Sequence, residues 1–328
     1  MSEDRRQLRN KKGKRKRKKI LVAWILTPIL ILALSAAAYG AFLYNKAESV
    51  MNKSFKPVDH GQNQVKQNVE NTSVLFIGVD DSQERKFGGS ARSDALMLAT
   101  FNKKDNSVKL LSIPRDSYVH IPEKNIYTKI THAHAYGGVK LTLETVEELL
   151  DVPVDYYVKM NFNAFMDVID ALGGIKVDVP YTFSEQDSHD RKRAITLQKG
   201  MQTLNGEQAL ALARTRHYDN DILRGERQQE IVKAILSKGA SINSIGKYSN
   251  VMEAVGKNMT TDLSFDQTKS FISYLTAGTK LKTESMTLKG SDSRIDGIYY
   301  YQLDQTALEK TKSILKKQLG ITSNDSNN

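Results

Sequence analysis

Six arginines stand beside or near acidic residues in three segments of the chain, and this combination suits the binding of phosphate. The segments are Ala91-Arg92-Ser93-Asp94, Ser112-Ile113-Pro114-Arg115-Asp116, and the stretch from Ala213 to Gln228, which holds Arg214, Arg216, Arg224 and Arg227. The planar fork of arginine matches the oxygens of a phosphate group. A single surface arginine more often belongs to an exposed ion pair, but the repeated association with acids favours a phosphate site.

The first two segments lie at the ends of apolar runs that are typical of strands. Arg92 comes just before one such run and Arg115 just after another. Strand ends are where ligand sites gather in α/β sheets. Arg214 and Arg216 alternate along the chain, so they can point the same way only where the backbone is extended.

The third segment continues as a helix whose faces can be counted. Successive helical residues turn by about 100°, so Asp221, Arg224 and Gln228 share one face, while Arg227 lies about 120° from Asp221. We therefore predict that Arg224 faces the phosphate site, and that removing Arg227 is much milder than removing Arg224.

Three carboxylates near the arginines are candidate metal ligands, namely Asp80, Asp81 and Asp94. Mg²⁺ is typically held by one or two carboxylates together with phosphate oxygens, so the cluster predicts a site that also binds Mg²⁺ or Mn²⁺. Zinc is an alternative, because His132 and His134 form a His-x-His pair beside Lys129. No third zinc ligand is obvious, and a structural role beside the site is the competing interpretation.

Composition and missing motifs exclude several kinds of chemistry. The chain contains no cysteine, which removes thiol catalysis and thiolate metal sites. The sequence has neither a Gly-x-Ser-x-Gly elbow nor a Gly-x-x-x-x-Gly-Lys-Ser/Thr loop. A hydrolase triad and a P-loop nucleotide site are therefore not expected.

The positive charge of the chain is concentrated at its N-terminus. Of a formal net charge of +11, residues 1–19 supply nine, from eleven Lys and Arg against Glu3 and Asp4, which leaves 11 − 9 = 2 for all other residues. Residues 20–44 then carry no charged side chain and are long enough to cross a bilayer as one helix. The positive-inside rule predicts a cytoplasmic tail over 1–19 and an extracellular remainder.

Aromatic residues at its two ends support this membrane span. Trp24 lies near one end, and Tyr39 and Tyr44 lie near the other, where aromatic rings prefer the membrane interface. A signal peptide cleaved near residues 35–38 is the alternative. A basic run also suits nucleic acid, but here it adjoins a membrane span, so we expect membrane lipid as its partner and no nucleic acid. The predicted location is the cell membrane, with a single pass.

Hydrophobic periodicity in the rest of the chain predicts strands that alternate with helices. Strands are expected at 73–79, 94–101, 107–113, 154–160, 175–179, 284–289 and 297–302, and helices at 139–150, 161–172, 205–214, 221–238, 248–258, 265–278 and 304–318. This order indicates an α/β fold, a three-layer α-β-α domain with a central mixed sheet, preceded by one transmembrane helix. The expected divisions are a stalk over 45–70, a catalytic core over 71–240, completing helices and strands over 241–321, and a polar tail over 322–328.

The order of motifs resembles the LytR-CpsA-Psr family over residues 20 to about 240. After the uncharged span come Val-Leu-Phe-Ile-Gly-Val-Asp, Arg-Ser-Asp, Ser-Ile-Pro-Arg-Asp, Lys-Ile-x-His-Ala, Ala-Arg-x-Arg and Asp-x-x-Arg-x-x-x-Gln. The resemblance implies an extracellular phosphotransferase of Gram-positive bacteria. Such an enzyme moves a phosphate-linked glycopolymer, such as wall teichoic acid, from an undecaprenyl-pyrophosphate carrier to peptidoglycan.

The resemblance also implies roles for individual residues. The pyrophosphate-binding positions would be Arg92, Arg115, Arg214, Arg216, Arg224 and Gln228, and we add Lys129 to them. The metal-binding acids would be Asp80 and Asp94, with Asp81 open as the alternative to Asp80. The catalytic residues would be Asp94, Arg115, Asp116 and Asp221, with Asp94 or Asp116 orienting or deprotonating the acceptor hydroxyl. The lipid tail would enter a slot lined by Phe162, Phe165, Leu172 and Leu210, for which ordinary core packing is the alternative.

The reaction implied by the resemblance is phosphoryl transfer. Mg²⁺ and the arginines would hold the pyrophosphate charge, a muramic acid hydroxyl of peptidoglycan would attack the phosphorus nearer the polymer, and undecaprenyl phosphate would leave. Two alternatives stay open. One is a polyprenyl-pyrophosphate phosphatase, in which water replaces the sugar hydroxyl, and the other is a cell-envelope regulator or transcriptional attenuator without catalysis.

Overall fold

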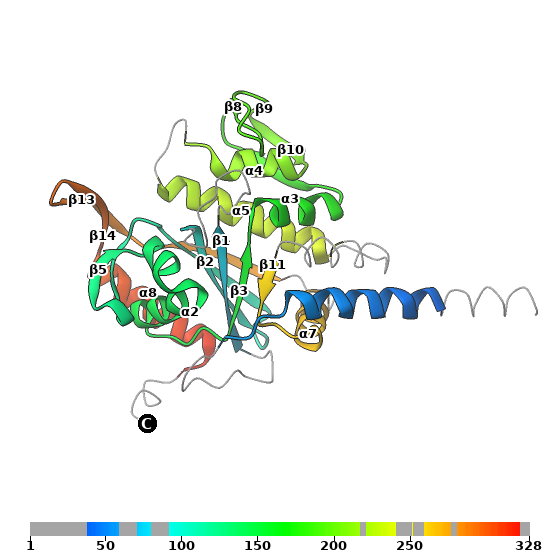
Figure 1. Cartoon of the computed structure of the whole chain (residues 1–328), viewed down its shortest axis with the longest axis horizontal. Coiled ribbons are helices and arrows are strands. Elements are labelled where there is room, and N and C mark those ends of the chain that lie inside the picture. The colour runs from blue at the N-terminus through cyan, green and yellow to red at the C-terminus, as the bar shows by residue number, and fades with distance from the viewer. Residues whose placement is uncertain are drawn as a thin grey trace, which may run out of the picture. The chain divides into compact units, whose positions relative to one another are not determined.

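The computed structural model describes residues 38–58, 71–79, 92–216, 221–240, 251, 259–276 and 281–321 (Figure 1). The predicted basic tail, most of the predicted membrane span, Asp80, Asp81, the helix expected at 248–258 (except residue 251) and the polar tail fall outside these ranges. No helix within them is long and apolar enough to cross a membrane. The chain divides into two units, Met1–Glu48 and Ser49–Asn328, and the larger one carries the site.

The folded unit begins earlier than the predicted stalk allowed. A helix covers residues 38–54, and Phe55 directly after it forms a parallel bridge with Thr261. The backbone N–H of Lys56 donates to the carbonyl of Thr261 at 2.7 Å, and the Tyr157 hydroxyl donates to the carbonyl of Lys56 at 2.7 Å. Residues 49–56 therefore belong to the domain and not to a free stalk.

A mixed sheet lies at the centre of the domain, as predicted. Its strands are β1 (Asn71–Val79), β2 (Ser93–Asn102), β3 (Ser107–Ile113), β6 (Tyr156–Met160), β11 (Met259–Thr261) and β12 (Lys282–Thr287), in the order β11-β6-β1-β2-β3-β12. Strand pairs β1–β6 and β3–β12 are parallel, and the other three pairs are antiparallel.

Helices cover both faces of this sheet (Figure 1). Alternate side chains of a strand point to opposite faces, and β1 shows the rule. Leu75 and Ile77 pack in a core with α2 (Thr131–Leu150) and α8 (Gln305–Leu319). Val74 and Phe76 belong to a second core on the other face, which includes residues of α5 (Asp221–Ala240) and α7 (Phe265–Thr276). The near-continuous apolar run of β1 is thus explained by burial on both sides.

A separate group of elements packs on α5 and builds its own core. It consists of α3 (Phe162–Ala171), β7 (Ile175–Val179), β8 (Phe183–Glu185), β9 (Ile195–Leu197), β10 (Gly200–Leu204) and α4 (Gly206–Arg214). Its core contains Ile169, Val177, Leu204 and Leu212, together with Ile231 of α5. The next residue of α5, Val232, instead packs in the core on the sheet side. Helix α5 therefore links the two parts.

Two hairpins were not fully predicted from the sequence. They are β4 (Tyr118–Ile121) with β5 (Ile126–Lys129), and β13 (Gly290–Ile295) with β14 (Ile298–Leu303), of which only β14 was expected. A parallel bridge between Ser117 and Tyr301 joins the second hairpin to the start of the first. Helix α2 follows the β4–β5 hairpin in the sequence, and non-helical backbone at Gly137 and Gly138 interrupts it. The helix predicted to begin at residue 139 is the part after this kink.

Candidate active site

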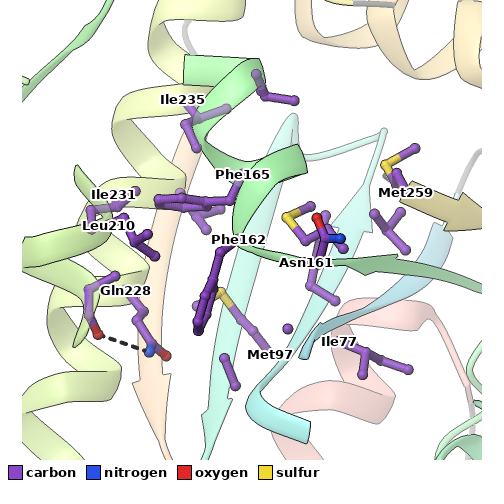
Figure 2. Close-up of a pocket in the computed structure, with 18 of the residues that line it drawn as sticks. Ile77, Met97, Asn161, Phe162, Phe165, Leu210, Gln228, Ile231, Ile235 and Met259 are labelled. Atoms are coloured by element: carbon purple, nitrogen blue, oxygen red, sulfur yellow. Dashed lines mark hydrogen bonds between the residues drawn. The ribbon is translucent and has the colours of Figure 1, made fainter. Parts of the chain in front are cut away.

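A cavity of about 660 Å³ opens between one face of the sheet and helices α3, α4 and α5. Much of its wall is apolar (Figure 2), with side chains such as Phe76, Met97, Phe162, Phe165, Leu210, Ile231 and Ile235. Helix α4 packs on both α3 and α5, and side chains of all three helices face the sheet residues Phe76 and Met97 across the cavity. Its volume lies within the usual range for small-molecule sites, about 300–1,000 Å³.

Three of the four residues predicted to form a lipid slot line this cavity. Phe162 and Phe165 come from α3, and Leu210 comes from α4. The fourth prediction is corrected by the structure. Leu172 is the C-terminal cap of α3 and packs in the core below it with Ile169, so it does not line the cavity.

The same cavity has a charged part. Asp94, Arg115, Arg214, Arg216, Arg224 and Gln228 line it along with the apolar residues. Residues that are far apart in the sequence, from β2 to α5, therefore meet at one place, as the arginine segments predicted. An apolar wall continuous with a group of arginines suits a ligand that has a long hydrocarbon tail and an anionic head.

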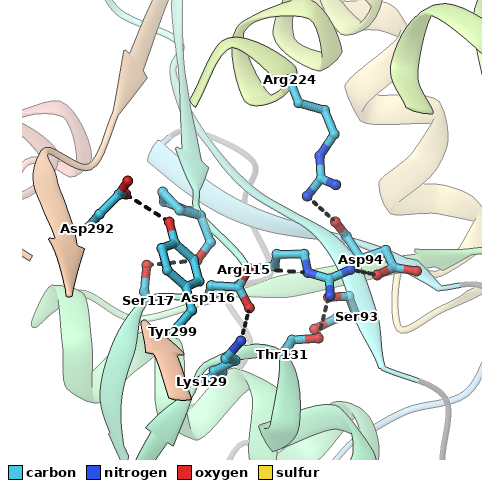
Figure 3. A network of polar contacts seen from close by, with 11 residues as sticks. Ser93, Asp94, Arg115, Asp116, Ser117, Lys129, Thr131, Arg224, Asp292 and Tyr299 are labelled. Carbon is cyan, nitrogen blue, oxygen red and sulfur yellow. Dashed lines mark hydrogen bonds and ion pairs between the residues drawn. The ribbon is translucent and has the colours of Figure 1, made fainter. Parts of the chain in front are cut away.

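Strand register brings Asp94 and Arg115 together. Strands β2 and β3 pair antiparallel, and the last pair of the ladder is Leu96 with Ile113, two residues from Asp94 on β2 and two residues from Arg115 in the turn after β3. The Arg115 guanidinium is ion-paired with the Asp94 carboxylate, and its Nε lies 3.7 Å from Oδ2 of Asp116 (Figure 3). Arg115 therefore connects one acid that lines the cavity to one that does not.

The network continues away from the cavity through Asp116. Its Oδ1 lies 2.8 Å from Nζ of Lys129, the last residue of β5 (Figure 3). The N-terminus of α2 links the start of β2 to the turn after β3. The Thr131 hydroxyl donates to the carbonyl of Ser93 at 2.7 Å, and the Thr131 N–H donates to the carbonyl of Arg115 at 3.2 Å. Lys129 and Asp116 thus lie beside the cavity and not in its wall.

Helix α5 approaches the strand ends closely enough to set Arg224 against Asp94. An added Cβ at Gly225 would lie 2.4 Å from the Ser112 hydroxyl oxygen, so any larger residue there would have to displace the Ser112 side chain. Arg224 is 8% exposed, and its Nη2 lies 3.5 Å from the carbonyl oxygen of Asp94. Both Arg224 and Gln228 line the cavity, which confirms the predicted helix face for these two residues. The side chain of Asp221 lies outside the described part.

Arg227 points away from the cavity, as the helix count predicted, and the structure adds contacts that the sequence did not show. The side chain is only 7% exposed. Its Nε donates to the carbonyl of Leu212 at 3.1 Å, and its Nη2 donates to the carbonyl of Thr215. Burial lowers the pKa of Arg227 from its ordinary value. This side chain therefore secures the C-terminal end of α4, and its removal cannot be mild for stability.

The end of α4 explains why the side chains of Arg214 and Arg216 both reach the cavity. Arg214 is its last residue, and Thr215 caps it with extended backbone, φ −56° and ψ 142°. Extended backbone lets residues two apart point the same way, and both arginines line the cavity. The Arg214 guanidinium carbon lies 5.0 Å from the centre of the Phe162 ring, and its Nη2 lies 3.4 Å from Oδ1 of Asp190. The contribution of Asp190 could not be found from sequence, since no local pattern links the two residues.

Positive charge also surrounds His132 beside the network. Burial, and next the charges of Arg92 and Lys129, lower the pKa of His132 below 6.5. Its Nδ1 lies 2.9 Å from the hydroxyl oxygen of Thr128. Arg92 is exposed and does not line the cavity. Across the described residues, no group of three or more His, Asp or Glu side chains comes together as for a metal ion, so the zinc alternative gains no support from His132 and His134.

Comparison with known proteins supports this arrangement. The LytR_cpsA_psr family model matches residues 39–317. A relative in Bacillus subtilis, the polyisoprenyl-teichoic acid–peptidoglycan teichoic acid transferase TagT, is 41% identical over 97% of this chain and 100% of its own length. Its counterpart TagU from the same organism is 38% identical over 93% of this chain and 98% of its own.

Solved structures agree with the sequence comparison. TagT bound to LIIa-WTA matches with a TM-score of 0.68 and 42% identity, over 81% of this chain and 97% of that one. YwtF (TagT) with bound octaprenyl pyrophosphate lipid matches with a TM-score of 0.63 and 40% identity, over 80% and 95% of the two chains. The motifs, the fold and these similarities lead to one conclusion: the chain belongs to the LytR-CpsA-Psr family.

Proposed function

We propose that this chain is a transferase that moves a phosphate-linked glycopolymer from a polyprenyl-pyrophosphate carrier to peptidoglycan. The observation that carries the proposal is a cavity in which an apolar wall meets four arginines, Arg115, Arg214, Arg216 and Arg224. The relatives named as teichoic acid transferases, and the related structures with octaprenyl pyrophosphate lipid or LIIa-WTA, support the same substrate class. Wall teichoic acid is therefore the polymer we propose.

In the proposed complex, the cavity separates the two parts of the donor. The polyprenyl tail lies against Phe162, Phe165 and Leu210, and the pyrophosphate lies at the arginines. Arginines fixed before the substrate arrives stabilise charge that shifts during transfer without reorganising. Arg224 is the most buried of them, and α5 sets it against the end of β2.

The proposed step is an in-line displacement at the phosphorus nearer the polymer. An acceptor hydroxyl oxygen of a muramic acid forms the new P–O bond, and the bond from that phosphorus to the bridging oxygen breaks. The electron pair leaves with polyprenyl phosphate, and the hydroxyl proton passes to a carboxylate. Of the two candidate acids, Asp94 lines the cavity and Asp116 does not, so we assign the orienting role to Asp94 and the positioning of Arg115 to Asp116.

A divalent cation fits the donor chemistry of this site. Asp94 lines the cavity among the arginines and offers one carboxylate, and phosphate oxygens of the substrate would complete a Mg²⁺ or Mn²⁺ site. Asp80, the second predicted ligand, lies outside the described residues. A bound Mg²⁺ would neutralise part of the pyrophosphate charge.

We further propose that the chain is held in the cell membrane by a helix over residues 20–44, with the domain outside the cell. The uncharged span after a strongly basic tail supports this topology. Anchoring suits a lipid-linked donor, because enzyme and substrate then diffuse in the same plane. The basic tail would contact anionic lipid on the cytoplasmic side.

Product analysis tests the proposed function. The full chain in proteoliposomes would be incubated with labelled polyprenyl-pyrophosphate-linked teichoic acid, with and without peptidoglycan and with excess chelator. We expect label on peptidoglycan, an equal release of polyprenyl phosphate, and loss of both with chelator. Free polymer as the main product in the presence of peptidoglycan would identify a phosphatase instead.

A further inference from the structure

A group of tyrosines forms an aromatic surface beside the active site. It comprises Tyr118 and Tyr127 of the β4–β5 hairpin and Tyr299 and Tyr300 of β14, and we refer to it as the tyrosine cluster. The rings of Tyr118 and Tyr127 have centroids 5.7 Å apart, and those of Tyr118 and Tyr300 are 4.8 Å apart. Two hairpins from distant parts of the sequence are therefore joined by ring contacts.

The cluster is only partly buried. Tyr300 is 9% exposed and acts as the base of the group, whereas Tyr127 is 62% exposed and Tyr299 is half-buried. A ring that is mostly exposed contributes little to the core, and exposed aromatic surface of this kind marks interaction sites. The cluster thus presents aromatic surface to solvent at Tyr127 and Tyr299.

Lys129 connects the tyrosine cluster to the active site. Its Nζ lies 2.8 Å from Oδ1 of Asp116, and the same atom lies 5.6 Å and 5.8 Å from the ring centres of Tyr299 and Tyr300. Asp116 is in turn close to Arg115, which lines the cavity (Figure 3). One continuous path of side chains therefore leads from the cavity to the aromatic surface.

Polar groups at the edge of the rings complete the surface. The Tyr299 hydroxyl donates to Oδ1 of Asp292 at 2.9 Å (Figure 3). The His120 ring centre lies 5.1 Å from that of Tyr127, and its Nε2 lies 3.0 Å from Oδ1 of Asn125. A pyranose ring has C–H groups on its faces and hydroxyls on its rim. Aromatic faces with carboxylate, amide and imidazole groups around them match both, because tyrosine combines an apolar face with a polar edge.

We propose that the tyrosine cluster is the acceptor subsite, where sugar rings of the peptidoglycan glycan strand stack on Tyr127 and Tyr299. This inference rests on the proposed transfer to peptidoglycan. The donor tail is assigned to the apolar cavity, so the acceptor must approach the arginines from outside it, and the contacts of Lys129 and Asp116 place the tyrosine cluster beside Arg115. A glycan strand is long and extended, and an open surface on two hairpins can bind it where a closed pocket cannot.

The experiment uses the full chain and the Tyr127→Ala/Tyr299→Ala double variant. Affinity for purified, peptide-free glycan strands is measured without donor, and transfer kinetics are measured with each substrate varied in turn. We expect the glycan affinity to fall, and the acceptor KM to rise, by about tenfold, the effect of losing two ring contacts. The donor KM should stay as in the parent.

Control variants keep the test decisive. Met201→Ala removes a side chain that is 69% exposed on β10, away from the cluster, and should bind glycan as the parent does. Tyr127→Phe/Tyr299→Phe keeps the rings and should retain most of the affinity, even if the double alanine variant folds poorly. Unchanged glycan affinity in a folded alanine variant would overturn the inference, and so would a rise in the donor KM alone.

The two proposals can fail separately. If the parent binds glycan strands through the tyrosines but never transfers polymer to peptidoglycan, the proposed function is wrong and the binding surface stands. If transfer occurs normally and glycan affinity does not depend on the tyrosines, the acceptor subsite is wrong and the proposed function stands.

Discussion

The carboxylate of Asp94 and the guanidinium of Arg115 form an ion pair at the cavity wall, just beyond the last pair of the β2–β3 ladder. Both charges are partly exposed, with side-chain exposures of 33% for Asp94 and 22% for Arg115. Such a pair adds little to stability, on the order of 0–1 kcal/mol. We expect the ion pair instead to fix the positions of both side chains before a charged substrate binds.

Replacing Asp94 separates function from stability. We expect Asp94→Asn to fold and melt as the parent does, yet to lose about 10²–10³ in transfer rate, the usual effect of removing one preorganised polar group from a site. The Mg²⁺ concentration for half activity should also rise. Asp266→Asn is the matched control, because Asp266 is an exposed partner of Lys269 on α7. Normal activity of Asp94→Asn at low Mg²⁺ would contradict both assigned roles.

Arg224 should be the arginine whose loss harms catalysis most. Arg224→Ala removes a buried charge from the cavity wall, and we expect transfer to fall about 10²–10³-fold. Arg224→Lys should recover little, because a point charge cannot reproduce the planar fork. Lys317→Ala, which removes one exposed positive charge from α8, is the control. If Arg224→Ala and Lys317→Ala were equally active, Arg224 would not bind the pyrophosphate.

Arg227, three residues further along α5, should behave in the opposite way. Arg227→Met leaves the carbonyls of Leu212 and Thr215 without this donor, which costs about 1–3 kcal/mol for buried acceptors. We expect the melting temperature to fall by several degrees, at roughly 2–4 °C per kcal/mol for a domain of this size. Activity per folded molecule should fall far less than in Arg224→Ala. An unchanged melting temperature would remove the structural role.

These two arginines show what a sequence can predict here. The helical period gave the direction of both side chains correctly, because it depends only on local geometry. It could not show that Arg227 meets the carbonyls at the end of α4, since those partners are fixed by tertiary packing. The four-residue strands β4 and β5 were missed for a related reason, as they are too short for a clear period. Leu172 was misplaced because an apolar helix end can face either a cavity or a core.

The apolar cavity should discriminate between donors by the length of the tail. Val168 of α3 is half-buried and lines the cavity, so Val168→Trp would fill part of the space with little effect on the helix. We expect this variant to lose affinity for long polyprenyl pyrophosphates while short prenyl pyrophosphates bind as in the parent. The measurement is the dissociation constant for a series of chain lengths. Equal losses for short and long chains would show that the tail lies elsewhere.

A last prediction concerns the charges that face His132. Burial is the first cause that lowers its pKa below 6.5, followed by the charges of Arg92 and Lys129, while Asp116 raises the pKa and Arg115 lowers it further. The folded protein binds the His132 proton less tightly than the unfolded chain does. The contribution of neutral His132 to the stability of the fold is therefore fully present above pH 6.5. It is lost as the pH falls through the lowered pKa of the folded protein.

NMR titration of the His132 ring tests this arrangement directly. The pKa of His132 should lie below 6.5 in the parent and move upward in Arg92→Ala and in Lys129→Met, since each variant removes a facing positive charge. His120, whose pKa is raised by its hydrogen bond to Glu148 and next by that to Asn125, is an internal control that should not move with Arg92→Ala. In His132→Gln, the loss of stability as the pH falls below 6.5 should be smaller than in the parent. A His132 pKa that is the same in the parent and in Arg92→Ala would mean that this arginine does not face the network.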